Sequence, residues 1–177
     1  IMAFQTIVSR NVDPLDSAVV TVTRMKASDA YNIIPAQVEL AGTVRTYTIE
    51  VRDLIERRMN EIATNLCLAM GCQAEFTMEH HVLPVENHPD VAARVQKVAG
   101  TLFDADKILT DERTMGSEDV GLLMDDVPGT FVFLGSMNEE RGLNFGHHHP
   151  RFDIDEDSLA SGVALMTAAL ADYLISE

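Results

Sequence analysis

The sequence is poor in basic residues and in cysteine, and its apolar stretches are short. It holds 13 Lys and Arg against 28 Asp and Glu, a formal net charge of −15. Such a surface repels phosphate backbones, so nucleic-acid binding is not expected. Without a long uncharged apolar run no membrane span is expected, and no basic and apolar leader is recognisable at the start. We therefore expect a soluble, acidic, cytoplasmic protein.

Two cysteines are too few for the disulfide framework of a small secreted domain. Cys67 falls inside a predicted helix, and Cys72 follows that helix in a C-x4-C spacing. A zinc site would need a second cysteine pair or histidines at ligand spacing nearby. We interpret both as core or half-buried free thiols.

The composition is that of an ordinary globular protein, with 46% apolar and 23% charged residues among 177. This length suits one compact domain or two small ones. The first ten residues carry apolar side chains at helical spacing but no capping residue before them. We therefore expect the sequence to be a piece of something longer.

The first half of the chain alternates helical and extended patterns. In chain order the spacing predicts a helix to Arg10, strands over 18–26 and 36–47, a helix over 49–70 closed by Gly71, and a strand over 73–82. This order predicts a two-layer α/β sandwich over residues 1–84, with one strand missing before residue 1.

The second half begins after two prolines, Pro84 and Pro89, that indicate a domain boundary. The predicted elements are a helix over 89–102, a short strand near Ile108, a helical segment within 114–129, a buried strand over 130–135, and a helix over 157–174. The last helix is expected to be capped by Asp155 or Asp157. Its expected inward face consists of Leu159, Val163, Met166 and Leu170.

Three adjacent histidines, His147, His148 and His149, form the strongest concentration of metal-ligand side chains. They follow a predicted strand and a glycine-bearing loop, where α/β folds commonly carry their sites. One loop supplies one or two ligands at most, and a catalytic metal site needs about three. Asp153 and Asp155 could orient an imidazole. The residues alone leave two interpretations, a metal ligand or a solvated polar loop.

Two other places could bind an anionic group. Asn32 lies in a loop and Arg45 on the polar face of the following strand, where a guanidinium fork suits a carboxylate; a solvated arginine is the alternative. Gly116 and Ser117 precede Glu118, so backbone N–H groups could approach a ligand there. The alternative is that Ser117 caps a helix.

Five stretches, in this order, closely resemble one family. They are "NVDPLDSAVVTVTRM", "YNIIPAQVELAGTVRTY", "TMGSEDV", "FVFLG" and "HHPRFDIDEDSL". They resemble the metal-dependent amidohydrolases that include hippurate hydrolase and the indole-acetyl-amino-acid hydrolases, within the wider aminoacylase and carboxypeptidase group. The resemblance spans essentially the whole chain.

The resemblance implies two domains. Residues 1–84 match the α/β lid, or dimerisation, domain without its first strand, and residues 85–177 match the C-terminal part of a zinc-exopeptidase-like α/β catalytic domain. The family's chain is about twice as long, so the amino-terminal part of its catalytic domain has no counterpart here.

The resemblance also assigns a role to the histidine loop. His148 takes the place of the metal-ligand histidine in the family's H-x-P-R-F motif, with His149 at the variable position. The other ligands, a cysteine, histidines and a glutamate, fall before residue 1, as does the glutamate that acts as general base. Cys67 and Cys72 do not match the family's ligand cysteine.

The remaining correspondences concern the substrate. Asn32 and Arg45 match the residues that grip the carboxylate of the amino-acid half. Gly116 and Ser117 match the loop that lines the substrate pocket, and Glu118 would lie near the metals.

The implied reaction is hydrolysis of an N-acyl amino acid to a carboxylic acid and an amino acid. Two divalent ions, zinc or manganese with cobalt or nickel as alternatives, would activate water and polarise the amide carbonyl while the glutamate moves the proton. The chain alone is expected to be inactive, and the lid is expected to form a homodimer or larger oligomer. The alternative is a stand-alone dimerisation module without catalysis.

Overall fold

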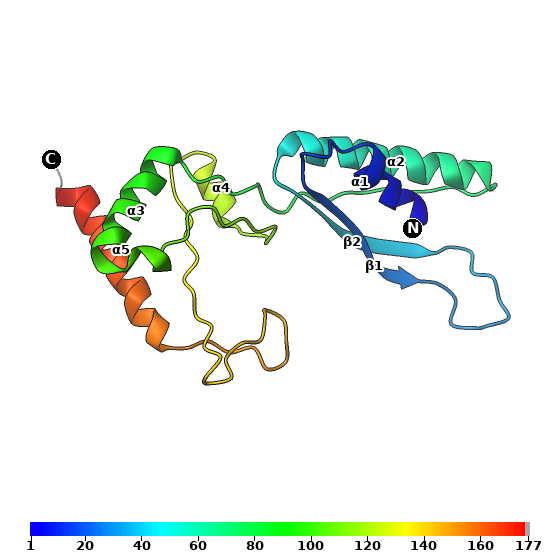
Figure 1. Ribbon diagram of the computed structural model, residues 1–177. Coiled ribbons are helices and arrows are strands. Elements are labelled where there is room, and N and C mark those ends of the chain that lie inside the picture. Colours follow the sequence, from blue (N-terminus) through cyan, green and yellow to red (C-terminus); the bar gives the residue numbers. More distant parts are fainter. Residues whose placement is uncertain (176–177) are drawn as a thin grey trace. The chain divides into compact units, whose positions relative to one another are not determined.

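The computed structural model describes residues 1–175 and divides them into two compact units (Figure 1). The first unit comprises Ile1–Val85 together with Thr114–Leu122. The second unit runs from Glu86 to Arg113 and resumes at Leu123. The sequence predicts a domain boundary at residue 84, which would place residues 114–122 in the second domain rather than in the first unit. The domain bounds of a longer protein stay a prediction.

The first unit contains both predicted helices and the first two predicted strands, which form a hairpin. Its elements are η1 (Met2–Phe4), α1 (Gln5–Arg10), β1 (Ala18–Lys26), β2 (Glu39–Thr46) and α2 (Ile49–Ala69). The two strands pair antiparallel, and their register shifts by one residue between Val22 and Arg24. Such a bulge bends a hairpin and increases its twist.

The core of the first unit lies where α1, α2 and the hairpin meet. Its buried residues are Ile7, Val12, Val20, Val51 and Ile55. Ile7 and Ile55 are completely buried, one from each helix. The α2 helix begins at Thr48, whose hydroxyl oxygen accepts a hydrogen bond from the Val51 N–H at 3.3 Å. This cap satisfies one of the helix's first free N–H groups and places Val51 and Ile55 on the core side.

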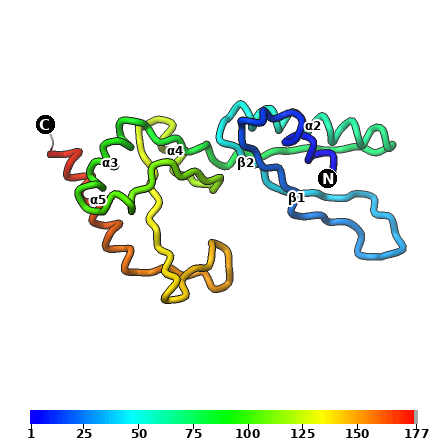
Figure 2. The backbone as a smooth tube through the Cα atoms, viewed as in Figure 1, coloured from blue at the N-terminus to red at the C-terminus, as the bar shows by residue number. Residues whose placement is uncertain are grey.

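The strand predicted over residues 73–82 is not formed. The segment is extended after α2 (Figure 2). Its residues Ala74, Phe76 and Met78 are half-buried in alternation with exposed neighbours. Among the described residues, however, the only sheet consists of β1 and β2. A strand requires a neighbouring strand to receive its hydrogen bonds, and this segment has none. The predicted two-layer sandwich is therefore present with a smaller sheet.

The second unit is mainly helical. It contains α3 (Pro89–Leu102), η2 (Ala105–Lys107) and α5 (Asp157–Ile175), while α4 (Val120–Met124) crosses the division between the units. The predicted helices are confirmed. The predicted strands near Ile108 and over 130–135 are wrong: the first is replaced by η2, and Phe133 in the second is exposed. The described part of the second unit offers no sheet for either to join.

Helices α3 and α5 pack on each other through a small apolar contact and an ion pair. Val98 and Ala99 are buried, and Arg94 Nε donates to Asp172 Oδ2 at 2.5 Å. The Arg94 guanidinium also lies over the Tyr173 ring, 5.2 Å from its centre. The face of α5 expected to point inward is instead exposed, at all four predicted positions.

By length and composition α5 is a candidate membrane span, with a mean hydropathy of 1.5, which the sequence interpretation had not recognised. Asp157 and Asp172 limit its uncharged stretch to residues 158–171. An uncharged stretch of 14 residues is shorter than a span and is typical of a helix buried in a protein core.

Candidate functional site

The loop that carries the three histidines is framed by a polar network at its base. Asn138 and Leu143 form an isolated antiparallel bridge before the histidines. The Asn138 Nδ2 donates to Asp155 Oδ2 at 2.6 Å, and the Arg141 guanidinium donates to Asp155 at 2.6 Å and bridges to Asp157 at 2.7 Å. Asp155 also accepts from the Asp157 N–H at 3.2 Å, as the predicted cap of α5. The network thus joins both ends of the loop.

Electrostatics keep this network charged. The hydrogen bond from Asn138, with smaller contributions from the Asp157 N–H and the Arg141 guanidinium, lowers the pKa of Asp155 despite partial desolvation. The hydrogen bond to Asp157 and the charges of both carboxylates raise the pKa of Arg141. Because Asp155 is engaged here and Asp153 accepts from the Ile154 N–H, neither bonds a histidine within residues 1–175. The expected orienting role for these carboxylates is therefore wrong in this structure.

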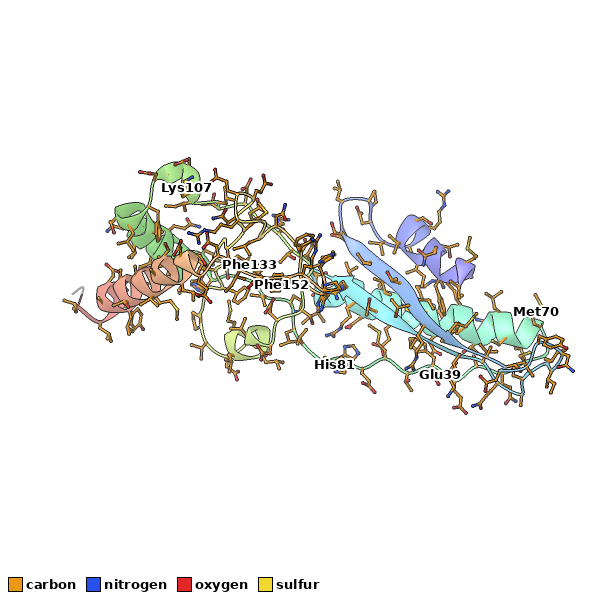
Figure 3. All side chains as sticks on the ribbon, turned by 90° about the horizontal axis from the view of Figure 1, so that it is seen from below. Glu39, Met70, His81, Lys107, Phe133 and Phe152 are labelled. Atoms are coloured by element: carbon orange, nitrogen blue, oxygen red, sulfur yellow. The ribbon has the colours of Figure 1, made fainter. Side chains whose placement is uncertain are left out.

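Aromatic contacts hold the outer two histidines. The His149 ring stacks on Phe145 with centres 4.4 Å apart, and the His147 ring meets Phe152 edge-on at 4.9 Å (Figure 3 labels Phe152). Within the described part of the chain, no hydrogen bond or ion pair engages His148. Of the three imidazoles, that of His148 is thus the one left unengaged.

The backbone also distinguishes His148. Its φ is +66°, the only positive φ of a non-glycine residue among those described. Histidine is one of the few residue types enriched in this left-handed conformation, and strained positions of this kind cluster at functional sites. This backbone conformation distinguishes His148 from His147 and His149. It fits a role as metal ligand, which remains a prediction. In residues 1–175, no three His, Cys, Asp or Glu side chains lie close enough together to hold a metal ion.

In the first unit, Arg45 meets the loop that carries Gly116 and Ser117. Arg45 Nη1 donates to the backbone oxygen of Met115 at 2.5 Å. The Gly116 N–H donates to the Thr114 hydroxyl at 3.1 Å, which closes a tight turn. The structure therefore brings together two places that the sequence interpretation had considered separately.

Close packing fixes the end of this loop. Gly121 is buried against the Leu83 carbonyl, where a Cβ atom would approach to 2.6 Å. Glu118 is half-buried, and its Oε1 lies near Gly116. Helix α4 begins at Val120, so Asp119 rather than Ser117 precedes it. The helix-capping alternative for Ser117 is therefore wrong, whereas its role in binding a ligand stays a prediction.

Asn32 lies away from Arg45. Arg45 pairs with Val19, whereas the loop of residues 27–38 leaves the opposite end of the hairpin, after the Lys26 and Glu39 pair (Figure 1). Six residues of strand span roughly 20 Å. The structure does not bring these two predicted carboxylate-binding residues together within one chain.

Sequence reasoning missed three contributors: the Met115 carbonyl, the aromatic supports of the histidines, and the Asn138–Arg141–Asp155 network. Phe145 and His149 are four residues apart in an irregular loop, so no regular period linked them. A backbone carbonyl has no sequence signal at all. Asp155 had a signal, since it precedes a helix, but only capping and an imidazole contact were considered, and its hydrogen bonds from Asn138 and Arg141 were not.

The fold and these local arrangements define a mixed α/β protein with a histidine loop of metal-ligand type. The sequence profile of Peptidase family M20/M25/M40 matches residues 4–172. The chain therefore belongs to this family, and the resemblance to the metal-dependent amidohydrolases is confirmed.

Individual relatives agree. The chain is 36% identical to N-acetyldiaminopimelate deacetylase of Streptococcus sanguinis, over 98% of this chain and 44% of that protein. It is 30% identical to IAA-amino acid hydrolase ILR1-like 2 of Arabidopsis thaliana, over 98% of this chain and 40% of that protein. The crystal structure of Bacillus subtilis YXEP, described as a dinuclear metal-binding peptidase of the M20 family, matches with a TM-score of 0.76 and 29% identity. That match covers all of this chain and 46% of YXEP.

The predicted α/β fold class is therefore confirmed, including its partial character. The chain spans less than half the length of these relatives.

Proposed function

We propose that this chain forms part of a metal-dependent amidohydrolase that hydrolyses N-acyl amino acids to a carboxylic acid and a free amino acid. The observation that carries the proposal is the histidine loop, where His148 alone is unengaged in a left-handed backbone within an H-x-P-R-F motif. The names of relatives, a deacetylase of an N-acetylated amino acid and a hydrolase of amino-acid conjugates, support this substrate class.

His148 would provide one imidazole to a two-metal site of zinc or manganese, with cobalt or nickel as alternatives. Its ring is exposed and has no hydrogen-bond or ion-pair partner among residues 1–175, which suits this role, and the family relative described as dinuclear supports the number of metal ions. When bound, such ions polarise the amide carbonyl and lower the pKa of a water molecule. Since the described residues contain no further ligand cluster, we expect the 177-residue chain alone to be inactive.

Arg45 and the Gly116–Ser117 turn would hold the substrate's carboxylate. The guanidinium already donates to a neutral carbonyl, that of Met115, and a carboxylate is a stronger acceptor for the same fork. The Gly116 N–H already donates to the Thr114 hydroxyl, so the additional donor would be the Ser117 N–H, beside a residue that has no side chain. Holding the carboxylate fixes the position of the scissile amide, which is a large part of the catalytic advantage. Glu118 would stand beside this turn, near the metals.

Asn32 would act on the site of a second copy. Its loop leaves the hairpin roughly 20 Å from Arg45, a separation that argues against the two residues gripping one carboxylate from the same chain. In a two-fold dimer formed through the lid, each site would contain Arg45 of one chain and Asn32 of the other.

Mixed dimers test this arrangement. In the full-length protein, Arg45→Ala and Asn32→Ala should each abolish most activity. Mixing and re-equilibrating the two variants should restore about a quarter of wild-type activity, because half the dimers would then hold one intact site. No recovery, with dimer exchange demonstrated by mass, would mean that both residues serve their own chain.

The ligand assignment is tested by His148→Ala in the full-length protein, with His147→Ala as the matched control. We expect His148→Ala to lose metal and to lower kcat/KM by ~100-fold or more, since even the loss of a group supporting a ligand costs about 10–100-fold. His147→Ala should keep its metal content. If both variants retain metal and activity, neither His147 nor His148 is the ligand.

A second candidate function is a dimerisation module without catalysis. The observation that favours it is the two-stranded sheet, which has unpaired edges able to receive a strand from another molecule. Light scattering of the 177-residue chain tests this directly. A clean monomer at high concentration would count against it.

A further inference from the structure

The two cysteines lie on either side of the carboxyl end of α2. The helix ends at Ala69, Met70 caps it, and Gly71 follows with φ +73° (Figure 3 labels Met70 at this end). The Cys72 N–H donates to the Cys67 carbonyl at 2.8 Å, and the Gly71 N–H donates to the Leu68 carbonyl at 3.1 Å. These two hydrogen bonds define a Schellman motif, in which the side chains of the outer residues commonly touch. Here the outer residues are Cys67 and Cys72.

The backbone hydrogen bond limits how far apart these residues can be. The path from Cys67 Cα through its carbonyl oxygen to the Cys72 nitrogen and Cα includes the 2.8 Å hydrogen bond. With standard bond lengths for the other steps, the two Cα atoms are separated by at most ~6.7 Å. Disulfides bridge Cα atoms about 4.4–6.8 Å apart. The Cα separation is therefore no larger than disulfides bridge.

Both sulfur atoms are free, and neither is deeply buried. Cys67 is half-buried and Cys72 is exposed, so the interpretation of Cys72 as a core or half-buried thiol is wrong. Cys72 Sγ makes only a weak contact, 3.8 Å from the Met70 carbonyl oxygen. Within the described chain no third His, Cys, Asp or Glu joins them in a metal-binding group. The pair is thus suited to thiol chemistry rather than to metal binding.

We propose that Cys67 and Cys72 form a reversible dithiol–disulfide pair, oxidised by a small disulfide of the glutathione class. The exposed Cys72 thiolate attacks the small disulfide, forming a mixed disulfide and releasing one thiol. The Cys67 thiolate then attacks Cys72 Sγ, closing the protein disulfide and releasing the second thiol. Two electrons pass from the protein dithiol to the reagent, and the two protons leave with the released thiols.

The cross-link would fix the turn at the end of α2. It would span Gly71 and so hold the direction in which the following segment leaves the helix. That segment runs back along α2, where His80 Nε2 lies 3.1 Å from Glu56 Oε2. Oxidation would therefore stabilise the last turn of α2 and the first residues of the extended segment, without affecting the hairpin.

The experiment equilibrates the 177-residue chain in reduced and oxidised glutathione and analyses it by mass spectrometry with peptide mapping. The expected product is a monomer that has lost two hydrogen atoms, with Cys67 linked to Cys72. Chains carrying glutathione on both cysteines, or covalent dimers, would overturn the proposal. Cys67→Ser and Cys72→Ser should each leave one thiol that can only form a mixed disulfide.

A glycine substitution tests whether the turn is responsible. Gly71→Ala introduces a side chain at a positive φ, which costs roughly 1–2 kcal/mol, so the equilibrium constant for closing the disulfide should fall about tenfold. The matched control is Gly100→Ala in α3, where a Cβ atom meets nothing within 4 Å; its constant should be unchanged. Circular dichroism confirms that both variants keep their helices. An unchanged constant in Gly71→Ala would show that the Schellman turn does not bring the thiols together.

Discussion

The two units of this chain differ in whether their apolar residues find partners. In the first unit, two helices and a hairpin enclose a core that completely buries Ile7 and Ile55. In the second unit, Val98 and Ala99 of α3 are buried, while the apolar face of α5 is exposed. Burial of apolar surface is the main driving force of folding, so the first unit contains most of its own stability and the second does not. We expect that the exposed face of α5 becomes buried against other polypeptide.

The largest effect is expected from Ile55→Ala in α2. The side chain is completely buried, so its truncation leaves a cavity and should cost about 2–5 kcal/mol of unfolding free energy. Urea denaturation followed by circular dichroism measures this. Leu68→Ala on the same helix, at a position 71% exposed, should change stability by no more than about 0.5 kcal/mol. Equal costs at the two positions would mean that the first unit lacks a defined core.

A smaller effect is expected at the start of α2. Thr48→Ala removes the hydroxyl that accepts from the Val51 N–H and should cost about 1 kcal/mol. Thr64→Ala, an exposed position in the same helix, is the control and should be nearly neutral. The same denaturation experiment compares them. Since Ala is the better helix former, helix propensity cannot make Thr64→Ala destabilising; an equal cost at both positions would mean that the loss at Thr48 is not due to the cap.

In the second unit, stability should depend on pH through Asp155. Because its pKa is lowered in the folded chain, its carboxylate stabilises the fold above the ordinary carboxyl pKa of ~3.9, and this contribution is lost as pH falls below that value. NMR signals of residues 136–157 followed between about pH 6 and pH 2 should show the loop loosening in this range. Asn138→Ala removes the hydrogen bond that lowers the pKa most, so its loop should loosen at higher pH. Identical pH profiles would exclude Asn138 as the cause.

The smallest effect is expected on α5. Val163→Ala in the 177-residue chain should change stability by no more than about 0.5 kcal/mol, because the side chain is 66% exposed. In the full-length protein the same substitution should cost at least ~1 kcal/mol if that face becomes buried. Denaturation of both forms provides the comparison. A neutral result in both would mean that this face stays in water, and the expectation that it becomes buried would be wrong.

Predictions from sequence were confirmed for elements whose formation depends on residues close together along the chain. The bounds of α2 follow from the Thr48 cap, its helical period and Gly71, all of which are local. The hairpin follows from two adjacent extended stretches. Prediction failed for residues 73–82 and 130–135, whose alternating or apolar patterns are typical of strands but whose hydrogen-bonding partners are not among residues 1–175. An alternating or apolar pattern indicates that a segment can form a strand. Whether it does so depends on whether a neighbouring strand is available for hydrogen bonding.

The candidate site also combines features that the sequence predicts with features that only the structure reveals. The resemblance selected His148 from three equivalent histidines, and the structure adds a local reason in the aromatic contacts of the other two. The contact of Arg45 with Met115 joins positions 70 residues apart, and no periodicity could reveal it. The separation of Asn32 from Arg45 also became visible only when the strand register was known.

The effect of a substitution at His148 depends on two separate properties of the new residue. One is whether it provides an imidazole, and the other is whether it accepts the left-handed backbone. Glycine and asparagine accept a φ of +66° readily, so they should preserve the course of the loop while removing the imidazole. Valine and isoleucine remove the imidazole and also oppose the backbone conformation. A saturation library at this codon, scored for both activity and abundance, should therefore separate into two groups. One would be inactive yet abundant, and the other inactive and scarce.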